Sequence, residues 1–132
     1  MAKTTYAYGL GRRKSATARA RVYAGKGNIV INDKPALDYF SGNKQMAAEL
    51  LQPLVLLGKD KAHDISIRVS GGGLAGQVDA IKLAIAKAIS GDNEDLRSTL
   101  KKASLLKRDP REKERKKYGL RKARKKEQFS KR

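Results

Sequence analysis

The residues best suited to chemistry in this sequence are basic side chains clustered near the amino terminus. They lie just before and along one short stretch: Arg12, Arg13, Lys14, Arg19 and Arg21. A guanidinium can bind two phosphate oxygens at once, whereas a lysine ammonium acts as a point charge. A basic run is often only a solvated face, but the large positive charge of the whole chain favours another interpretation. We interpret the cluster as a surface for RNA phosphates.

A second basic stretch closes the sequence. From residue 107 onward there are 14 basic and 4 acidic residues, whereas residues 1–106 hold 17 basic and 9 acidic ones. Such a stretch is typical of an arm that folds onto a polyanion when it binds. A nuclear-type address, nonspecific polyanion binding and a probe threaded into folded RNA are the alternatives, and we favour polyanion binding. The residues expected to contact RNA here are Arg115, Lys116, Lys117, Arg121, Lys122, Arg124, Lys125 and Lys126.

Glycines offer a different chemistry where an apolar helical pattern begins. Gly71, Gly73 and Gly76 have the G-x-G-x-x-G spacing of dinucleotide-binding turns. No acidic residue ends a strand about 20 residues later, and no second strand–helix–strand unit follows. We therefore favour a tight strand-to-helix turn over a nucleotide site. A third interpretation stays open, in which exposed amides at Gly71, Gly72 and Gly73 hold an RNA phosphate.

The sequence contains no recognisable catalytic constellation. His63 is the single histidine and cysteine is absent, so disulfides and thiolate metal sites are excluded. Any Ser–His pair would have to use that one histidine, and the residues around Ser70 do not form a nucleophile elbow. We expect neither enzymatic activity nor a cofactor, a metal ion or a small-molecule substrate.

The overall composition indicates one modest domain with a polyanionic partner. Among 132 residues, 31 are Lys or Arg and 13 are Asp or Glu, which gives a formal net charge of +18. Nucleic acid neutralises such a chain with regularly spaced phosphates. A membrane fits less well, because there is no long apolar run and no basic amphipathic helix with bulky residues. The absence of a secretory signal and of cysteine indicates a cytoplasmic protein.

The first basic cluster requires a strand to position it. Residues 16–24 alternate with period two, so their alanines and Val22 share one face while Arg19 and Arg21 share the other. We predict strands over 16–24, 29–31 and 64–70, with a hairpin through residues 25–28 joining the first two. Helices are predicted over 32–40, 43–51 with Pro53 ending or kinking the second, 74–90 with Gly91 as its stop, and 93–106.

These elements predict an α+β domain, with a single sheet of about four strands and helices packed on one face. The uncovered face would carry Arg19 and Arg21. We divide the chain into a globular RNA-binding domain, 1–106, and a basic tail, 107–132. Asp109, Pro110 and Glu112 have the order of a helix start, so we predict a short helix at about 110–118 and an extended chain beyond Gly119.

Six stretches of the sequence resemble one known family. In chain order they are GRRKSATARARV, GNIVIN, SIRVSGGGLAGQVDAIKLAIAKAI, LRSTLKK, RDPREKERKKYGLRKARKK and QFSKR. They are similar to the ribosomal protein S-nine family of the small ribosomal subunit, and the likeness covers nearly the whole chain.

The resemblance implies a domain like the second domain of ribosomal protein S-five, placed on the subunit head against rRNA and neighbouring head proteins. It implies a tail that threads through rRNA, with Ser130, Lys131 and Arg132 near the anticodon stem-loop of peptidyl-site tRNA. Arg12, Arg13 and Lys14 match the family's basic N-terminal motif. Glu127 stands where many family members have proline, so the tail's path there departs from the family pattern.

Two other functions compete with this one. A DNA-compacting architectural protein would also be small and basic, but the sequence shows no dimer seam and no minor-groove arm. A nucleotide-dependent enzyme would rest on the glycines alone.

Overall fold

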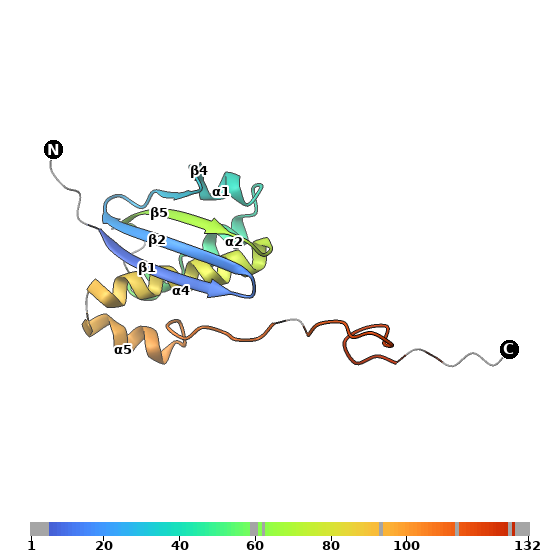
Figure 1. Ribbon diagram of the computed structural model, residues 1–132. Helices are drawn as coiled ribbons and strands as arrows, with labels where there is room; N and C mark the ends of the chain where they lie inside the picture. The colour runs from blue at the N-terminus through green and yellow to red at the C-terminus, as the bar shows by residue number, and fades with distance from the viewer. Residues whose placement is uncertain are drawn as a thin grey trace.

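The computed structural model describes residues 6–58, 61, 63–92, 94–112, 114–126 and 128. Its strands form one mixed sheet in the order β1-β2-β5-β3-β4. Figure 1 shows α4 lying across one face of this sheet, and the chain after α5 running away from the domain. The elements are β1 (Ala7–Arg13), β2 (Ala16–Ala24), β3 (Ile29–Ile31), β4 (Lys34–Pro35), α1 (Ala36–Tyr39), α2 (Lys44–Glu49), α3 (Gln52–Leu56), β5 (His63–Ser70), α4 (Leu74–Asp92) and α5 (Glu94–Lys102).

The predicted α+β fold is confirmed, and its core follows the alternation in β2 and β5. Ala18, Ala20 and Val22 of β2 are buried, while Arg19 and Arg21 are exposed on the opposite face. The isoleucines and the valine of β5 are buried in the same way. Because the side-chain period of a strand is two, each strand buries one face under α4 and leaves the other uncovered. No described helix is long and apolar enough to span a bilayer.

The helix predicted over 32–40 is wrong in its first half, because positive φ at Asn32 and Asp33 turns the chain back and β4 pairs antiparallel with β3. Only α1 remains of that helix.

A second strand that the sequence analysis did not predict is β1. β1 pairs antiparallel with β2 along its whole length. Gly9 and Gly11 alternate with larger residues in β1, and glycine normally weakens a strand assignment. Their reason is steric: a Cβ at Gly9 would lie 2.0 Å from the carbonyl oxygen of Ala84, and one at Gly11 2.0 Å from that of Ala80. The glycines let β1 lie directly against the backbone of α4.

The predicted hairpin between β2 and β3 is wrong, because β5 lies between these two strands. β5 pairs antiparallel with β2 and parallel with β3. Residues 25–28 instead cross the end of β5, where one carboxylate oxygen of Asp64 accepts the backbone N–H groups of Lys26 (2.9 Å), Gly27 (3.1 Å) and Asn28 (3.0 Å). These bonds, led by that of Asn28, lower the pKa of Asp64. The turn at residues 25–28 was predicted, but the strand that lies next to β2 is β5, which is distant in the sequence.

Two helix boundaries also differ from the prediction. Pro53 lies in the first turn of α3 instead of ending the preceding helix, since proline is well tolerated where no N–H partner is needed. Gly91 lies inside α4, which continues to Asp92. The last predicted helix is present as α5, with Leu100 buried and Leu96 packed against the core.

The short helix predicted at about 110–118 is absent from the described residues of that segment. Asp109 does form a local turn, because its carboxylate accepts the backbone N–H of Arg111 at 3.0 Å and also its guanidinium. No apolar stripe follows that could pack on the domain. A helix of under ten residues without tertiary packing is marginal, so the chain stays irregular here.

Candidate RNA interface

The uncovered face of the sheet, called the outer face below, brings arginines from three strands into rows. Tyr8 of β1 lies opposite Arg21 of β2, which in turn lies opposite Ser66 of β5. One row further along the strands, Arg19 lies between Leu10 and Arg68. Arg19 and Arg21 therefore occupy the face where the sequence predicted them, and Arg68 is a neighbour that the sequence analysis did not single out.

Three tyrosines gather on or beside the same outer face. The rings of Tyr6 and Tyr23 are tilted, with centroids 5.5 Å apart. The Arg21 guanidinium carbon lies 5.2 Å from the centroid of the Tyr6 ring, within the range of a cation–π contact. Tyr23 follows from the alternation of residues 16–24, whereas the sequence analysis missed Tyr6 and Tyr8. Their signal was the alternation of Tyr6, Tyr8 and Leu10, which became visible only once β1 was recognised as a strand.

The arginines of the outer face differ in their partners. Arg68 makes a two-pronged contact with the carboxylate of Asp33, at 3.0 and 3.1 Å. Arg21 lies over Tyr6, while neither Arg12 nor Arg19 has a hydrogen bond or ion pair with any described residue. Both unpaired side chains are exposed. Two guanidiniums are thus held in place, and two remain available for a phosphate.

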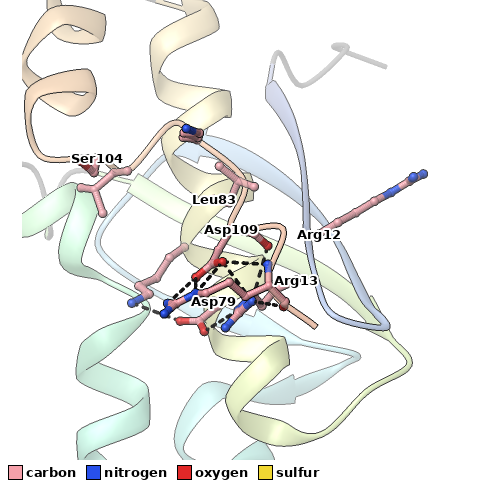
Figure 2. Close-up of a pocket in the computed structure, with 10 residues that line it drawn as sticks. Arg12, Arg13, Asp79, Leu83, Ser104 and Asp109 are labelled. Atoms are coloured by element: carbon pink, nitrogen blue, oxygen red, sulfur yellow. Dashed lines mark hydrogen bonds and ion pairs between the residues drawn. The ribbon is translucent and has the colours of Figure 1, made fainter. Parts of the chain in front are cut away.

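Arg13 lies next to Arg12 in the sequence but has a different environment. Figure 2 shows Arg12 pointing away while Arg13 points into a cluster of charged groups. The Arg13 side chain is only 12% exposed, and its nitrogens lie 3.4 Å from carboxylate oxygens of Asp79 and of Asp109. It also donates to the backbone carbonyl of Arg111. Arg13 therefore joins β1 to α4 and to residues 107–112, a segment we call the tail root.

The charges of the tail root are stabilised locally. Hydrogen bonds from Arg111, followed by the positive charge of Arg13, hold the pKa of Asp109 well below its ordinary value. The same contact raises the pKa of Arg111. Both groups therefore stay ionised at neutral pH, and the carboxylates of Asp79 and Asp109 offset the charges of Arg13 and Arg111.

Lys14 and the glycine-rich turn lie side by side at one end of the sheet. Lys14 is exposed and has a positive φ of 53°, at the turn between β1 and β2. Gly71 and Gly72 also have positive φ, and a Cβ at Gly71 would lie 2.5 Å from the carbonyl oxygen of Ser15. Close packing thus explains Gly71 and Gly72 without a ligand, whereas Gly73 faces open space. Phosphate binding by these three glycines stays a prediction.

The basic residues predicted to contact RNA in the tail are all exposed. They are Arg115, Lys116, Lys117, Arg121, Lys122, Arg124, Lys125 and Lys126. Glu114 pairs with Lys117 at 2.6 Å and with Arg124 at 2.8 Å, and these contacts lower its pKa. Gly119, with φ of 78°, lies within the loop that they close. Glu127, Ser130, Lys131 and Arg132 lie outside the described residues.

Comparison with known proteins identifies the family. Residues 11–132 match the family model described as "Ribosomal protein S9/S16". This chain belongs to that family. It is 50% identical over 125 residues to a protein of Synechococcus sp. (strain JA-3-3Ab) named "Small ribosomal subunit protein uS9", which covers 95% of this chain and 91% of the relative.

Two further relatives have the same printed name. The proteins of Synechococcus sp. (strain JA-2-3B'a(2-13)) and of Prochlorococcus marinus subsp. pastoris (strain CCMP1986 / NIES-2087 / MED4) are each 50% identical over 125 residues, covering 95% of this chain and 92% of the relative. As a member of this ribosomal protein family, the chain is a structural component and not an enzyme. Membership displaces both the DNA-compacting and the nucleotide-dependent hypotheses. Within the described residues, no group of three or more His, Cys, Asp or Glu could hold a metal ion.

Proposed function

We propose that this ribosomal protein binds rRNA in the head of the small subunit through its outer face and tail, and contacts peptidyl-site tRNA through its last residues. Family membership and the relatives' names give it a structural role in the small subunit, which in bacteria is cytoplasmic. Contacts with neighbouring head proteins are part of the proposal and rest on the family resemblance. The role in translation is to hold RNA in place, and no reaction is involved.

The observation that carries the proposal is the pairing state of the arginines. Arg12 and Arg19 are exposed and have no partner among the described residues, while Arg13 is occupied by carboxylates. Unpaired guanidiniums on an uncovered sheet face repel one another unless a polyanion covers them. Phosphate oxygens match the guanidinium fork, so an RNA backbone is the partner that fits this face best.

The tail supplies a second, less ordered contact. Its eight exposed basic residues have few carboxylates near them, with Glu114 pairing two of them. An arm of this composition gains most of its binding free energy from releasing counterions of the nucleic acid. The outer face then selects a folded site by its geometry, and the tail adds affinity that depends on salt.

The proposed tRNA contact concerns Ser130, Lys131 and Arg132, which lie outside the described residues. Its support is the family resemblance of the QFSKR ending together with the chemistry of two adjacent cations. Cations near phosphates steady an RNA without reading its sequence. Removing Lys131 and Arg132 should leave rRNA binding nearly intact and increase the dissociation of peptidyl-site tRNA from assembled subunits. A loss of rRNA binding in this variant would contradict the proposal that the domain and the rest of the tail bind rRNA while the last residues contact tRNA.

The decisive experiment compares the intact chain with a version that ends at Glu112, because this truncation keeps the contacts of Arg13 with the tail root. Binding to small-subunit head rRNA is measured across a salt series, with an unrelated folded RNA and a DNA duplex as competitors. Loss of eight phosphate contacts should make the log–log salt slope shallower by about 6–7, while the preference for head rRNA persists. Equal affinity for all three nucleic acids would contradict the proposal.

A further inference from the structure

The outer face is hollowed at one place. Five residues from three strands line a hollow of about 530 Å³: Tyr8, Arg19, Arg21, Ser66 and Arg68. Ser66 explains why the hollow exists. It lies opposite Arg21 on one side and Val30 on the other, and Arg68 follows it two positions later on the same face. A small residue surrounded by long ones leaves a space at the centre of the face.

The walls of the hollow combine an aromatic ring with guanidiniums. Tyr8 is 53% exposed, so its ring is open to a ligand. Two of the arginines are held by other groups, Arg21 by the Tyr6 ring and Arg68 by Asp33. Side chains that are already fixed lose less conformational entropy when a ligand binds. Of the three arginines that line the hollow, Arg19 alone has no partner among the described residues, so its charge is free for a ligand.

This combination fits an unpaired base better than a phosphate alone. A phosphate needs only donors, whereas an exposed aromatic ring offers a surface on which a base can stack. A base inside a duplex is stacked between its neighbours and cannot enter, so the ligand must come from a loop, a bulge or a single strand. The volume is also within the range of pockets that hold small organic groups, about 300–1,000 Å³.

We propose that the hollow binds one unpaired nucleotide of the rRNA, with its base stacked on Tyr8 and its phosphate bound by Arg19. Arg68 and the Ser66 hydroxyl would provide donors toward the edge of the base. This inference rests on the proposed rRNA binding and adds a base contact to it. The sequence analysis interpreted the basic cluster as a surface for RNA phosphates.

The test fills the hollow without removing any charge. Ser66→Phe places a ring at its centre, whereas Ser66→Ala leaves it open, and both substitutions lie on an exposed strand position that tolerates either residue. Each variant is bound to head rRNA, and the chemical reactivity of the unpaired bases is mapped. Wild type and Ser66→Ala should protect one particular unpaired base, and Ser66→Phe should leave that base reactive with the rest of the footprint retained. We expect an affinity loss of about tenfold.

Substitutions of the stacking ring provide an independent arm. Tyr8→Ala should expose the same base as Ser66→Phe does, while Tyr8→Phe should keep it protected, because stacking needs the ring and not the hydroxyl. Tyr118→Ala removes a fully exposed tyrosine of the tail and should leave that base protected. Thermal unfolding by circular dichroism checks that each variant is folded.

The outcomes separate this inference from the proposed function. If Ser66→Phe and Tyr8→Ala bind head rRNA with an unchanged footprint, the nucleotide site is wrong and rRNA binding stands. If free nucleoside monophosphates saturate the hollow as well as the rRNA does, the ligand is a free nucleotide and the inference is overturned. If wild type itself does not prefer head rRNA, the proposed function fails first.

Discussion

The outer face and the tail root both contain arginines, yet they use them in opposite ways. On the outer face Arg12 and Arg19 have no described partner, and one carboxylate, that of Asp33, lies beside Arg68. At the tail root, Arg13 of β1 contacts both Asp79 of α4 and Asp109, and Asp109 also binds Arg111. The first region keeps its positive charge for a partner, whereas the second uses it to join segments of the same chain.

The contrast is sharpest between Arg12 and Arg13, which are adjacent in β1. Because side chains alternate along a strand, Arg12 lies on the uncovered side and Arg13 on the side of α4, where Asp79 is located. A count of basic residues treats the two alike. Their environments differ because the fold provides carboxylates on one side of the sheet and open solvent on the other.

The largest expected effect comes from displacing β1, which carries both arginines. In Gly11→Ala the new Cβ would lie 2.0 Å from the backbone oxygen of Ala80, so the strand or the helix has to shift. Overpacking of this kind destabilises a core by about 3 kcal/mol, and thermal unfolding measures it. Gly91→Ala is the matched control, because its Cβ meets nothing within 4 Å inside α4 and should stabilise the helix by about 0.5–1 kcal/mol. Equal stability of the two variants would contradict the close packing of β1 on α4.

The next largest effect is on RNA affinity. It distinguishes arginines of the outer face from basic residues elsewhere on the domain. Arg12→Ala with Arg19→Ala should weaken binding to head rRNA about a hundredfold near physiological salt, since the charge-assisted contacts of the two unpaired guanidiniums are lost. The salt slope should become shallower by about 1.4–1.8. Arg97→Ala with Lys101→Ala removes the same charge from the exposed side of α5 and serves as the control. Equal losses in the two double variants, measured by filter binding, would mean that net charge alone determines affinity.

The third prediction compares Arg12 and Arg13 directly. Since the chain lacks cysteine, Lys87→Cys on α4 and Arg115→Cys on the tail provide two unique sites for spin labels. Arg13→Ala should broaden the distance distribution between them, because it removes the ion pairs that join the tail root to the domain. Arg12→Ala should leave that distribution unchanged and instead lower rRNA affinity. If Arg12→Ala also broadens the distance distribution, the proposed difference between Arg12 and Arg13 is wrong.

The sequence predicted the parts of this molecule that depend on local patterns. Alternation located β2, β3 and β5, and placed Arg19 and Arg21 on the uncovered face. Helical periodicity located α4 and α5. Each of these features depends on residues only a few positions apart, which is the range over which side-chain period is informative.

The rest required contacts between distant segments. β1 was missed because its glycines suit the backbone of α4 and not an isolated strand. The wrong hairpin has the same cause, since Asp64 is 36 positions from Asn28 in the sequence but binds its N–H. The carboxylate partners of Arg13 are 66 and 96 positions away, so no local pattern indicated them. RNA binding by Arg13 stays a prediction. The hollow depends on Ser66, and the sequence alone does not show that this small residue lies between longer side chains of neighbouring strands.

The smallest expected effect is the pH dependence of the tail root. The pKa of Asp109 is depressed in the folded chain, so its stabilising contribution is present above the ordinary aspartate value and is lost as pH falls through the lower folded value. The distance distribution between the two labels should therefore stay narrow down to about pH 4 and broaden only under more acidic conditions.

The charged groups around Asp109 explain why this change is modest. Arg111 stays protonated throughout. Lys82 pairs with Asp79 at 3.4 Å, and Asp79 keeps a contact with Arg13 after Asp109 is neutralised. In Asp109→Asn the distribution should already be slightly broadened at pH 7 and should change less on acidification. Circular dichroism recorded in parallel separates release of the tail root from acid unfolding of the domain. Release of the wild-type tail root between pH 6 and 5 would mean that the Asp109 carboxylate does not hold it, and that the outer face and the tail root differ less than their geometry indicates.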